Sequence, residues 1–272
     1  MSDRVQGSDV RRVLVAFVLP MVLWPVPGRA EGLLDPRADP YFVRPELRAL
    51  LDWVTFRLTF DAGDMMPDMA VGDFAPAVQQ PPQFAPGLKG QALVAGDGSG
   101  IAIYPRPGNV PLETRGAVSL WLCPVAWTHQ NGGNTTFAMT GNASFYLQRQ
   151  GPMHDAEGVV TRQEGVQYLI FSKTAGNQCL MFGTEDWPPG KWRLLVANWT
   201  WPTMEFSLDG GEFQSMALKG APGADEFHGL LVGASGGEKT LMDELTFYRR
   251  PLELAEVRAL QEALQPKAEG TK

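Results

Sequence analysis

Short strand-like runs separated by turn residues constrain the fold of this chain most. Between residues 91 and 248, eleven runs of five to nine residues are rich in apolar and β-branched side chains, with glycine, proline, asparagine or aspartate between them. Asp209-Gly210-Gly211 is a strong hairpin signal among them. A single run of helix formers follows Pro251. The pattern predicts an all-β fold, a two-sheet antiparallel β-sandwich (jelly roll) with a short C-terminal helix.

Composition agrees with a turn-rich β protein. The chain of 272 residues has 30 glycines and 22 prolines, and only 19% of its residues are charged. No internal repeat or low-complexity linker divides it, so we expect one folded domain. A closed barrel is the alternative, but the long loops expected at 61–90 and 150–165 fit it less naturally.

The first strand is predicted at 54–60, where "VTFRLTF" alternates between apolar and polar residues. Such alternation is typical of a half-buried antiparallel strand, with Arg57 and the threonines on the face away from the interior. The preceding "RPELRALLDW" (44–53) carries leucines along one side of a short predicted helix. The residues expected to face the interior are Val54, Phe56, Leu58 and Phe60.

The first thirty residues have the organisation of a secretory signal. A basic leader precedes an apolar run (13–27), and small residues at 28–30 suit a signal peptidase. The run is about half of the ~20 residues that span a bilayer, and it contains prolines, so a retained membrane anchor is the less favoured alternative.

We therefore predict a signal peptide (1–30), a lead-in with a short helix (31–53), the sandwich domain (54–265) and a tail (266–272). The location is expected to be extracytoplasmic, secreted or periplasmic, with no transmembrane span after cleavage. The Ala/Gly/Pro/Arg-rich composition favours a bacterial source.

Charge argues against nucleic acid as a partner. Removal of residues 1–30 takes away four of the 23 basic and two of the 30 acidic side chains, which leaves 19 against 28 and a net charge of −9. No basic run remains to bind phosphates.

The two cysteines, Cys123 and Cys179, leave two alternatives open. After export they could form a disulfide, or they could stay free thiols that pack as small apolar side chains.

Six motifs follow one another in a fixed order over about residues 54–264. They are "FDAGD" (60–64), "FAPGLKGQALVAGDG" (84–98), "GAVSLWLCPVAW" (116–127), "GKWRLLVANWTWPTMEFSLDGGEF" (190–213), "GLLVGAS" (229–235) and "MDELTFYRRPLELAEVRAL" (242–260). This order resembles the laminin G-like, concanavalin A-like jelly-roll superfamily, especially its bacterial extracellular members.

The resemblance implies that the strand with Asp243 and Glu244 closes the sandwich and pairs near the first strand. In many relatives the matching aspartate helps to bind a structural calcium ion, together with backbone carbonyls near the first strand. Here Asp243 would be a ligand, with Asp61 or the carbonyl groups around Gly63 as its partners. The alternative is that Asp243 only accepts hydrogen bonds from loop amides.

The sequence lacks the motifs of the enzymes known on this fold. The Glu-x-Asp-x-x-Glu string of laminarinase-type hydrolases does not occur. The Arg-x-Glu-x-Arg and Gln-x-His strands of alginate lyases, a nucleophile elbow and a zinc-protease motif are missing too. We therefore predict a protein that is not an enzyme.

Candidate ligand-binding residues lie in two places. One predicted loop holds Trp127, His129 and Asn131, and a second site has Trp199 and Trp201 on one side of a strand end. Aromatic faces stack on sugar rings and amides bind their hydroxyls, so we expect a non-catalytic module that binds a glycan or glycoprotein. Core packing of these tryptophans is the alternative.

Two other functions remain as alternatives. The first is an accessory subunit that docks on a cell-surface or membrane protein assembly. The second, less favoured, is a polysaccharide-degrading enzyme, which would need a groove with two carboxylates roughly 5–10 Å apart.

Overall fold

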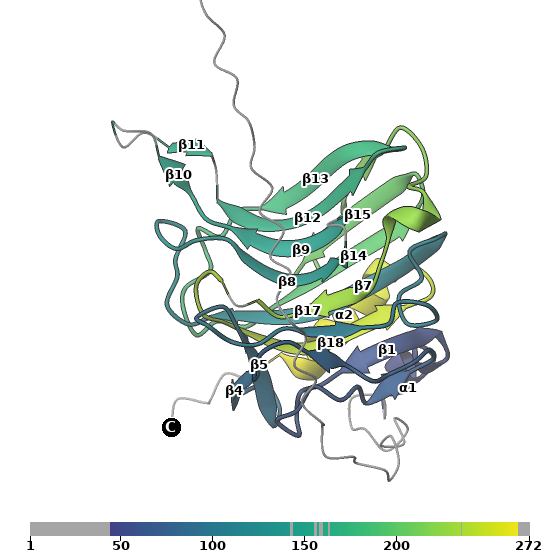
Figure 1. Ribbon diagram of the computed structural model, residues 1–272, viewed down its shortest axis with the longest axis horizontal. Helices are drawn as coiled ribbons and strands as arrows, with labels where there is room; N and C mark the ends of the chain where they lie inside the picture. The colour runs from purple at the N-terminus through teal and green to yellow at the C-terminus, as the bar shows by residue number, and fades with distance from the viewer. Residues whose placement is uncertain are drawn as a thin grey trace, which may run out of the picture.

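The computed structural model describes residues 44–265, except 142, 143, 155, 156, 158, 159, 163 and 235. The predicted signal peptide, the start of the lead-in and the tail lie outside the described residues. The described chain is a sandwich of two antiparallel sheets with a short C-terminal helix (Figure 1), which confirms the predicted fold class.

The larger sheet has the strand order β16-β15-β14-β7-β18-β1-β2, with β5 paired to β18 and β4 paired to β5. Strand β18 lies between β7 and β1 and is antiparallel to both, so the closing strand pairs with the first strand as predicted. The strands of this sheet are β1 (Val54–Leu58), β2 (Met69–Ala70), β4 (Gln83–Pro86), β5 (Gln91–Ala95), β7 (Arg115–Pro124), β14 (Arg193–Thr200), β15 (Thr203–Leu208), β16 (Gln214–Ala217) and β18 (Thr240–Tyr248).

The smaller sheet has the order β13-β12-β9-β8-β17-β6-β3, and Figure 1 shows β13, β12, β9, β8 and β17 following one another down the view. A separate ribbon of β10 (Met153–His154) and β11 (Val160–Arg162) projects beyond it. The strands of the smaller sheet are β3 (Ala77–Val78), β6 (Ala102–Tyr104), β8 (Thr135–Thr140), β9 (Phe145–Gln150), β12 (Gly165–Ser172), β13 (Gly176–Phe182) and β17 (Leu230–Val232).

The main core fills the space between the sheets, and β1 contributes to it differently from the prediction. Phe56, Leu58 and Phe60 belong to this core, as expected. The expectation of a half-buried strand is wrong, because all five residues of β1 are buried. The pairing with β18 also shifts register between Val54 and Phe56, so Val54 packs in a second apolar cluster instead.

In that second cluster, helices pack on the outer face of the larger sheet. The lead-in forms α1 (Pro45–Arg48) and a 3-10 turn (Leu51–Trp53), and the run after Pro251 forms α2 (Leu254–Leu264), as predicted. Both helices place leucines against outward side chains of the larger sheet, so this sheet is apolar on both faces. The buried members are Leu47, Leu50, Val54, Ala117, Trp121, Leu194, Val196, Tyr248, Leu252, Val257 and Leu260.

Candidate functional site

The predicted loop tryptophan, Trp127, lies in the core. Its side chain is 0% exposed, and its indole N–H donates to the hydroxyl of Thr240 at 2.7 Å. One ring edge meets Trp187 with centroids 5.6 Å apart, and the Arg149 guanidinium lies 4.4 Å from the Trp127 ring centroid. A sugar ring has no open face to stack on, so the expected role of Trp127 is corrected to core packing.

Trp199 and Trp201 are also held from within the protein. Their indole N–H groups donate to the carbonyl oxygens of Pro111 and Leu112, at 3.0 and 2.6 Å. Trp199 is fully buried, and the partly buried Trp201 stacks between it and Phe227, each at a centroid distance of 6.5 Å. The two rings do lie together as predicted, but they pack in the core and form no exposed platform.

The two predicted binding places lie at opposite ends of the sandwich. The loop with His129 and Asn131 follows the end of β7, whereas Trp201 donates its backbone N–H to Thr114, just before β7 begins. Ten residues of β7 separate these ends by about 33 Å. His129 is half-buried and Asn131 is exposed, and the Asn131 side chain accepts the N–H of Thr128 at 2.8 Å within its own loop.

Two of the predicted calcium residues, Asp61 and Asp243, meet at the turn 86–90. Asp243 is fully buried, and its two carboxylate oxygens accept the N–H groups of Leu88 at 2.8 Å and Glu244 at 2.9 Å. A Cβ atom on Gly87 would lie 2.5 Å from this carboxylate, and one on Gly90 would lie 2.6 Å from the carboxylate of Asp61. Only glycine therefore fits these positions without movement of the chain.

The charge balance at this turn is unfavourable to the ionised form of Asp243. Burial and the neighbouring charges of Glu244 and Asp61 together raise the pKa of Asp243 to about 8, although the N–H groups of Leu88 and Glu244 that donate to this carboxylate lower it. Asp61 pairs with Lys89 at 2.8 Å through one oxygen, and its other oxygen is buried without a hydrogen-bond partner. Among the described residues, no group of three or more His, Cys, Asp or Glu side chains is arranged to hold a metal.

Both cysteines are free. Cys123 is buried in β7 of the larger sheet, and Cys179 is exposed on β13 of the smaller sheet. Of the two alternatives that the sequence left open, the structure therefore shows the one without a disulfide.

The feature that sequence reasoning missed is the outer face of the smaller sheet. One side chain from each of its seven strands lies in register with the next, and together they form what we call the apolar row. Neither apolar cluster of the protein includes these side chains. In spatial order the row consists of Ala77, Ile103, Leu231, Met139, Tyr146, Leu169 and Cys179.

Aromatic and amide groups flank the apolar row. Phe171 is 43% exposed, and its ring meets Tyr146 edge to face with centroids 5.7 Å apart. On the other side, the Gln148 side-chain amide donates to the Gln167 side-chain oxygen at 2.9 Å, and Gln167 donates to the sulfur of Met181 at 3.4 Å. We call Gln148 and Gln167 the amide pair.

No charged side chain interrupts this face within the described strands of the smaller sheet. Alternation places the core residues of each strand inward, so their neighbours point outward. The buried Arg149 is the one charged residue of β9, and it points inward with Phe145 and Leu147. The outward residues are Ala77, Ile103, Thr136, Met139, Tyr146, Gln148, Gln150, Gln167, Leu169, Phe171, Asn177, Cys179, Met181 and Leu231.

A signal for this face does exist in the sequence. Strand β12 contains Tyr168-Leu169-Ile170-Phe171, four successive apolar residues, whereas a strand with one solvated face would alternate. Such a run indicates that both faces are apolar. It does not indicate which neighbouring side chains complete the outer face, because that depends on the strand order.

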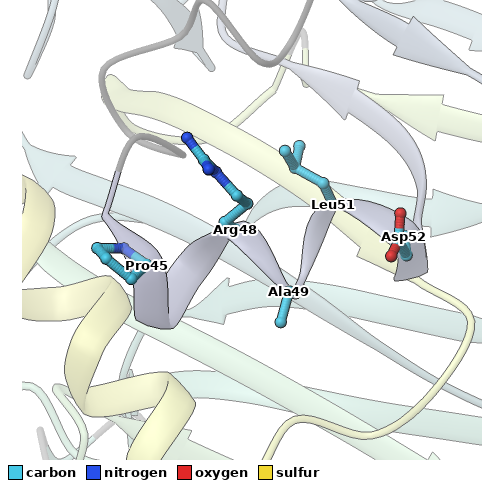
Figure 2. Close-up of a pocket in the computed structure, with 5 residues that line it drawn as sticks. All are labelled: Pro45, Arg48, Ala49, Leu51 and Asp52. Atoms are coloured by element: carbon cyan, nitrogen blue, oxygen red, sulfur yellow. The ribbon is translucent and has the colours of Figure 1, made fainter.

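A hollow of about 660 Å³ lies beside α1. Figure 2 shows that its lining comes from α1 and the following turn, and that Arg48 and Leu51 point away from Ala49. These side chains do not converge on a common point, so the hollow offers no set of groups that would orient a ligand.

Comparisons with known proteins support the fold. No model of a known protein family matches the chain, and no curated protein matches it by sequence. The laminin G-like assignment therefore stays a prediction, although the two antiparallel sheets are consistent with a jelly roll.

Solved structures do match. The binding domain of botulinum neurotoxin DC in complex with SialylT has a TM-score of 0.63 and 13% identity, over 80% of this chain and 53% of that chain. The same domain in complex with rat synaptotagmin II has a TM-score of 0.62 and 11% identity, over 80% of this chain and 53% of that chain. The serotype D ligand-binding domain in complex with N-acetylneuraminic acid has a TM-score of 0.62 and 10% identity, over 80% of this chain and 52% of that chain.

This chain spans about half the length of these neighbours, and identities this low establish a shared fold alone. In the described part of the chain, no helix is long and apolar enough to cross a membrane.

Proposed function

We propose that this protein is an extracytoplasmic, non-catalytic binding module that holds a glycan on the outer face of its smaller sheet. The observation that carries the proposal is the uncharged composition of that face. Tyr146 within the apolar row and Phe171 beside it offer aromatic surface, and the amide pair offers hydrogen-bonding groups. Ligand sites typically combine a largely apolar lining with a few placed polar groups.

Three further points support a glycan-binding role. Structural neighbours were solved with sialic acid or a sialylated ligand, as the names of these complexes state. Glycoside hydrolysis uses a pair of carboxylates flanking the bond, and the outward side chains of the described strands of the smaller sheet include none. The outer face of the larger sheet is covered by α1 and α2, whereas the outer face of the smaller sheet exposes Phe171 and Cys179, beside the buried Leu169 and Gln167.

Replacement of the two aromatic side chains tests the proposal. We expect Tyr146→Ala and Phe171→Ala each to raise the Kd for a bound glycan about tenfold, or ~1.4 kcal/mol. Phe74→Ala is the matched control, because Phe74 is 45% exposed and lies in the loop between β2 and β3, outside the strands of the sheet. Isothermal titration calorimetry against a glycan identified on an array gives the constants. Equal Kd values for all three variants and the wild type would place the glycan elsewhere or reject the proposal.

Docking on a protein assembly is the second candidate. It is favoured by the neighbour solved with rat synaptotagmin II, and an apolar row also suits a protein surface. The described part of the lead-in is not free for a partner, because it packs on the larger sheet and contributes Leu47 and Leu50 to its cluster. The Tyr146→Ala variant separates the two candidates. If it loses glycan binding but a partner protein still co-purifies with it, the protein partner does not depend on the glycan site.

We also propose a structural calcium ion at the turn 86–90, held by Asp243 and Asp61 with backbone carbonyls nearby. The fit rests on the buried oxygen of Asp61 without a hydrogen-bond partner and on the burial of Asp243 beside a second carboxylate. Calcium accepts such oxygen ligands and would favour the ionised carboxylates. Lys89 already pairs with Asp61, so the ion would have to share or replace that contact.

Thermal melts test the calcium proposal. For extracellular modules the Kd for calcium is about 10⁻⁴–10⁻³ M, so 5 mM calcium corresponds to about 1–2 kcal/mol and a rise in Tm of about 3–6 °C. Without calcium, the folded-state pKa of about 8 exceeds the unfolded value of 3.8, so stability falls as pH rises between these values. We expect the calcium effect to be largest at pH 8 and absent in Asp243→Asn. A Tm that EDTA and calcium both leave unchanged would identify Asp243 as a hydrogen-bonding residue only.

A further inference from the structure

We infer that the ligand of the smaller sheet is a linear glycan without charged groups, laid along the apolar row and across the strands. This inference rests on the proposed glycan-binding function. It adds two properties that the function alone does not give: the absence of charge on the ligand and the direction in which the ligand lies.

The absence of charge follows from the side chains that face outward. Recognition of a carboxylate or sulfate relies on Arg or Lys, whose charge-assisted hydrogen bonds are about twice as strong as neutral ones. The described outward side chains of the smaller sheet carry none, although the chain has 23 basic residues. A negatively charged sugar placed here would lose its hydration without gaining a cation.

The direction follows from the register of the strands. Each neighbour in the apolar row is a directly paired residue, from Ala77 on β3 to Cys179 on β13. Strands lie about 4.8 Å apart, so the row extends roughly 29 Å across the sheet. The row is several times longer than one sugar ring, so it suits an extended oligosaccharide better than a single terminal sugar.

The amide pair has the chemistry to bind hydroxyl groups along this chain. Gln148 and Gln167 lie two residues along the strands from Tyr146 and Leu169, and therefore on the same face of β9 and β12. In their mutual hydrogen bond, Gln148 donates and Gln167 accepts, so the Gln148 oxygen keeps acceptor capacity for a sugar hydroxyl. A sugar hydroxyl can donate to this oxygen, and neither the hydroxyl nor the amide carries a charge.

Cys179 provides a readout at one end of the row. It is exposed, whereas Cys123 is buried and burial raises the pKa of the Cys123 thiol to about 11. Burial also raises the pKa of the Cys179 thiol, so a maleimide fluorophore at pH 7.5 attaches to Cys179 selectively because this side chain is exposed and Cys123 is not. A ligand laid along the row to β13 should change its emission, and labelled Cys123→Ser protein serves as the control for selectivity.

The experiment compares neutral and acidic oligosaccharides of matched length. Cellohexaose, mannohexaose and xylohexaose are the neutral probes, and hexamers of polygalacturonate and hyaluronan with sialyllactose are the acidic ones. We expect at least one neutral chain to bind tenfold or more tightly than every acidic probe. Its Kd should fall from dimer to hexamer as the row is filled, and it should change the Cys179 label.

The possible outcomes separate the two proposals. Acidic probes that bind as tightly as neutral ones, and lose binding in Tyr146→Ala, would overturn the inference and leave glycan binding at this face standing. Equal Kd values for dimer and hexamer would overturn the direction along the row. Failure of every probe, neutral or acidic, on a broad glycan array would reject the glycan-binding function itself. A Gln148→Lys variant adds a positive test, because it should gain affinity for the acidic probes and keep its Tm within a few degrees.

Discussion

Replacement of Arg149 with methionine is expected to lower the free energy of unfolding by about 3–5 kcal/mol. The Arg149 side chain is 0% exposed, and its guanidinium donates to the carbonyl oxygens of Gly133 at 2.8 Å, Thr128 at 2.9 Å and Asn131 at 2.5 Å. Methionine fills similar volume but offers none of these donors. Three carbonyl groups of the loop between β7 and β8 would lose their hydrogen bonds, and the ring of Trp127 would lose its cation.

Urea unfolding followed by circular dichroism measures this change. Arg149→Lys should fall between methionine and the wild type, because lysine keeps the charge but lacks the planar fork that reaches several carbonyls. Arg48→Met, on the exposed side of α1, is the control and should change stability by less than about 0.5 kcal/mol. If Arg149→Met costs less than about 1 kcal/mol, the loop is held by its other contacts.

The role of Arg149 explains why the predicted binding loop failed as a site. The loop with Trp127 and Asn131 looked like a free, polar, aromatic loop in the sequence. The structure ties its backbone to a cation buried in β9, and that cation also covers a ring face of Trp127. A charged residue in a strand usually faces water, so sequence alone could not assign Arg149 to the inside.

The fold was more predictable than the site. Alternation and turn signals reflect local chemistry, so they predicted the Asp209-Gly210 hairpin and the helix after Pro251. The pairing of the closing strand with the first strand was implied by the family resemblance, and the structure shows it. The apolar row depends on seven strands from positions 77 to 231 meeting in one order. No local pattern encodes that order, and the same outward residues in another order would form no continuous surface.

The two adjacent carboxylates of β18 are a second feature that local sequence patterns did not explain. Glu244 adopts a positive φ of 53°, and the pairing of β18 with β7 shifts register between Asp243 and Thr246. This bulge lets both side chains leave the core, Asp243 to the turn 86–90 and Glu244 to Arg57. The sequence shows two charges in a buried strand, but not the bulge that accommodates them.

Arg57→Met is the second variant for which we expect a large loss, about 3–5 kcal/mol of unfolding free energy. The guanidinium of Arg57 lies 2.7 Å from the Glu244 carboxylate, and both side chains are 2% exposed. Methionine would leave a buried carboxylate without its cation, which costs far more than the pair contributes relative to apolar residues. The variant Arg258→Met is the matched control, because Arg258 and its partner Glu212 are both exposed and an exposed pair contributes about 0–1 kcal/mol.

The double variant Arg57→Met/Glu244→Gln decides between a lost charge pair and lost packing. If the cost comes from the charge of Glu244 after the loss of Arg57, the neutral glutamine should restore most of it, to within about 1–2 kcal/mol of the wild type. A double variant as unstable as Arg57→Met alone would assign the cost to packing of the arginine side chain. Glu244→Gln also removes one of the charges that raise the pKa of Asp243. The double variant should therefore lose less stability than the wild type between pH 4 and pH 8, which connects the ion pair to the calcium turn in a single set of unfolding curves.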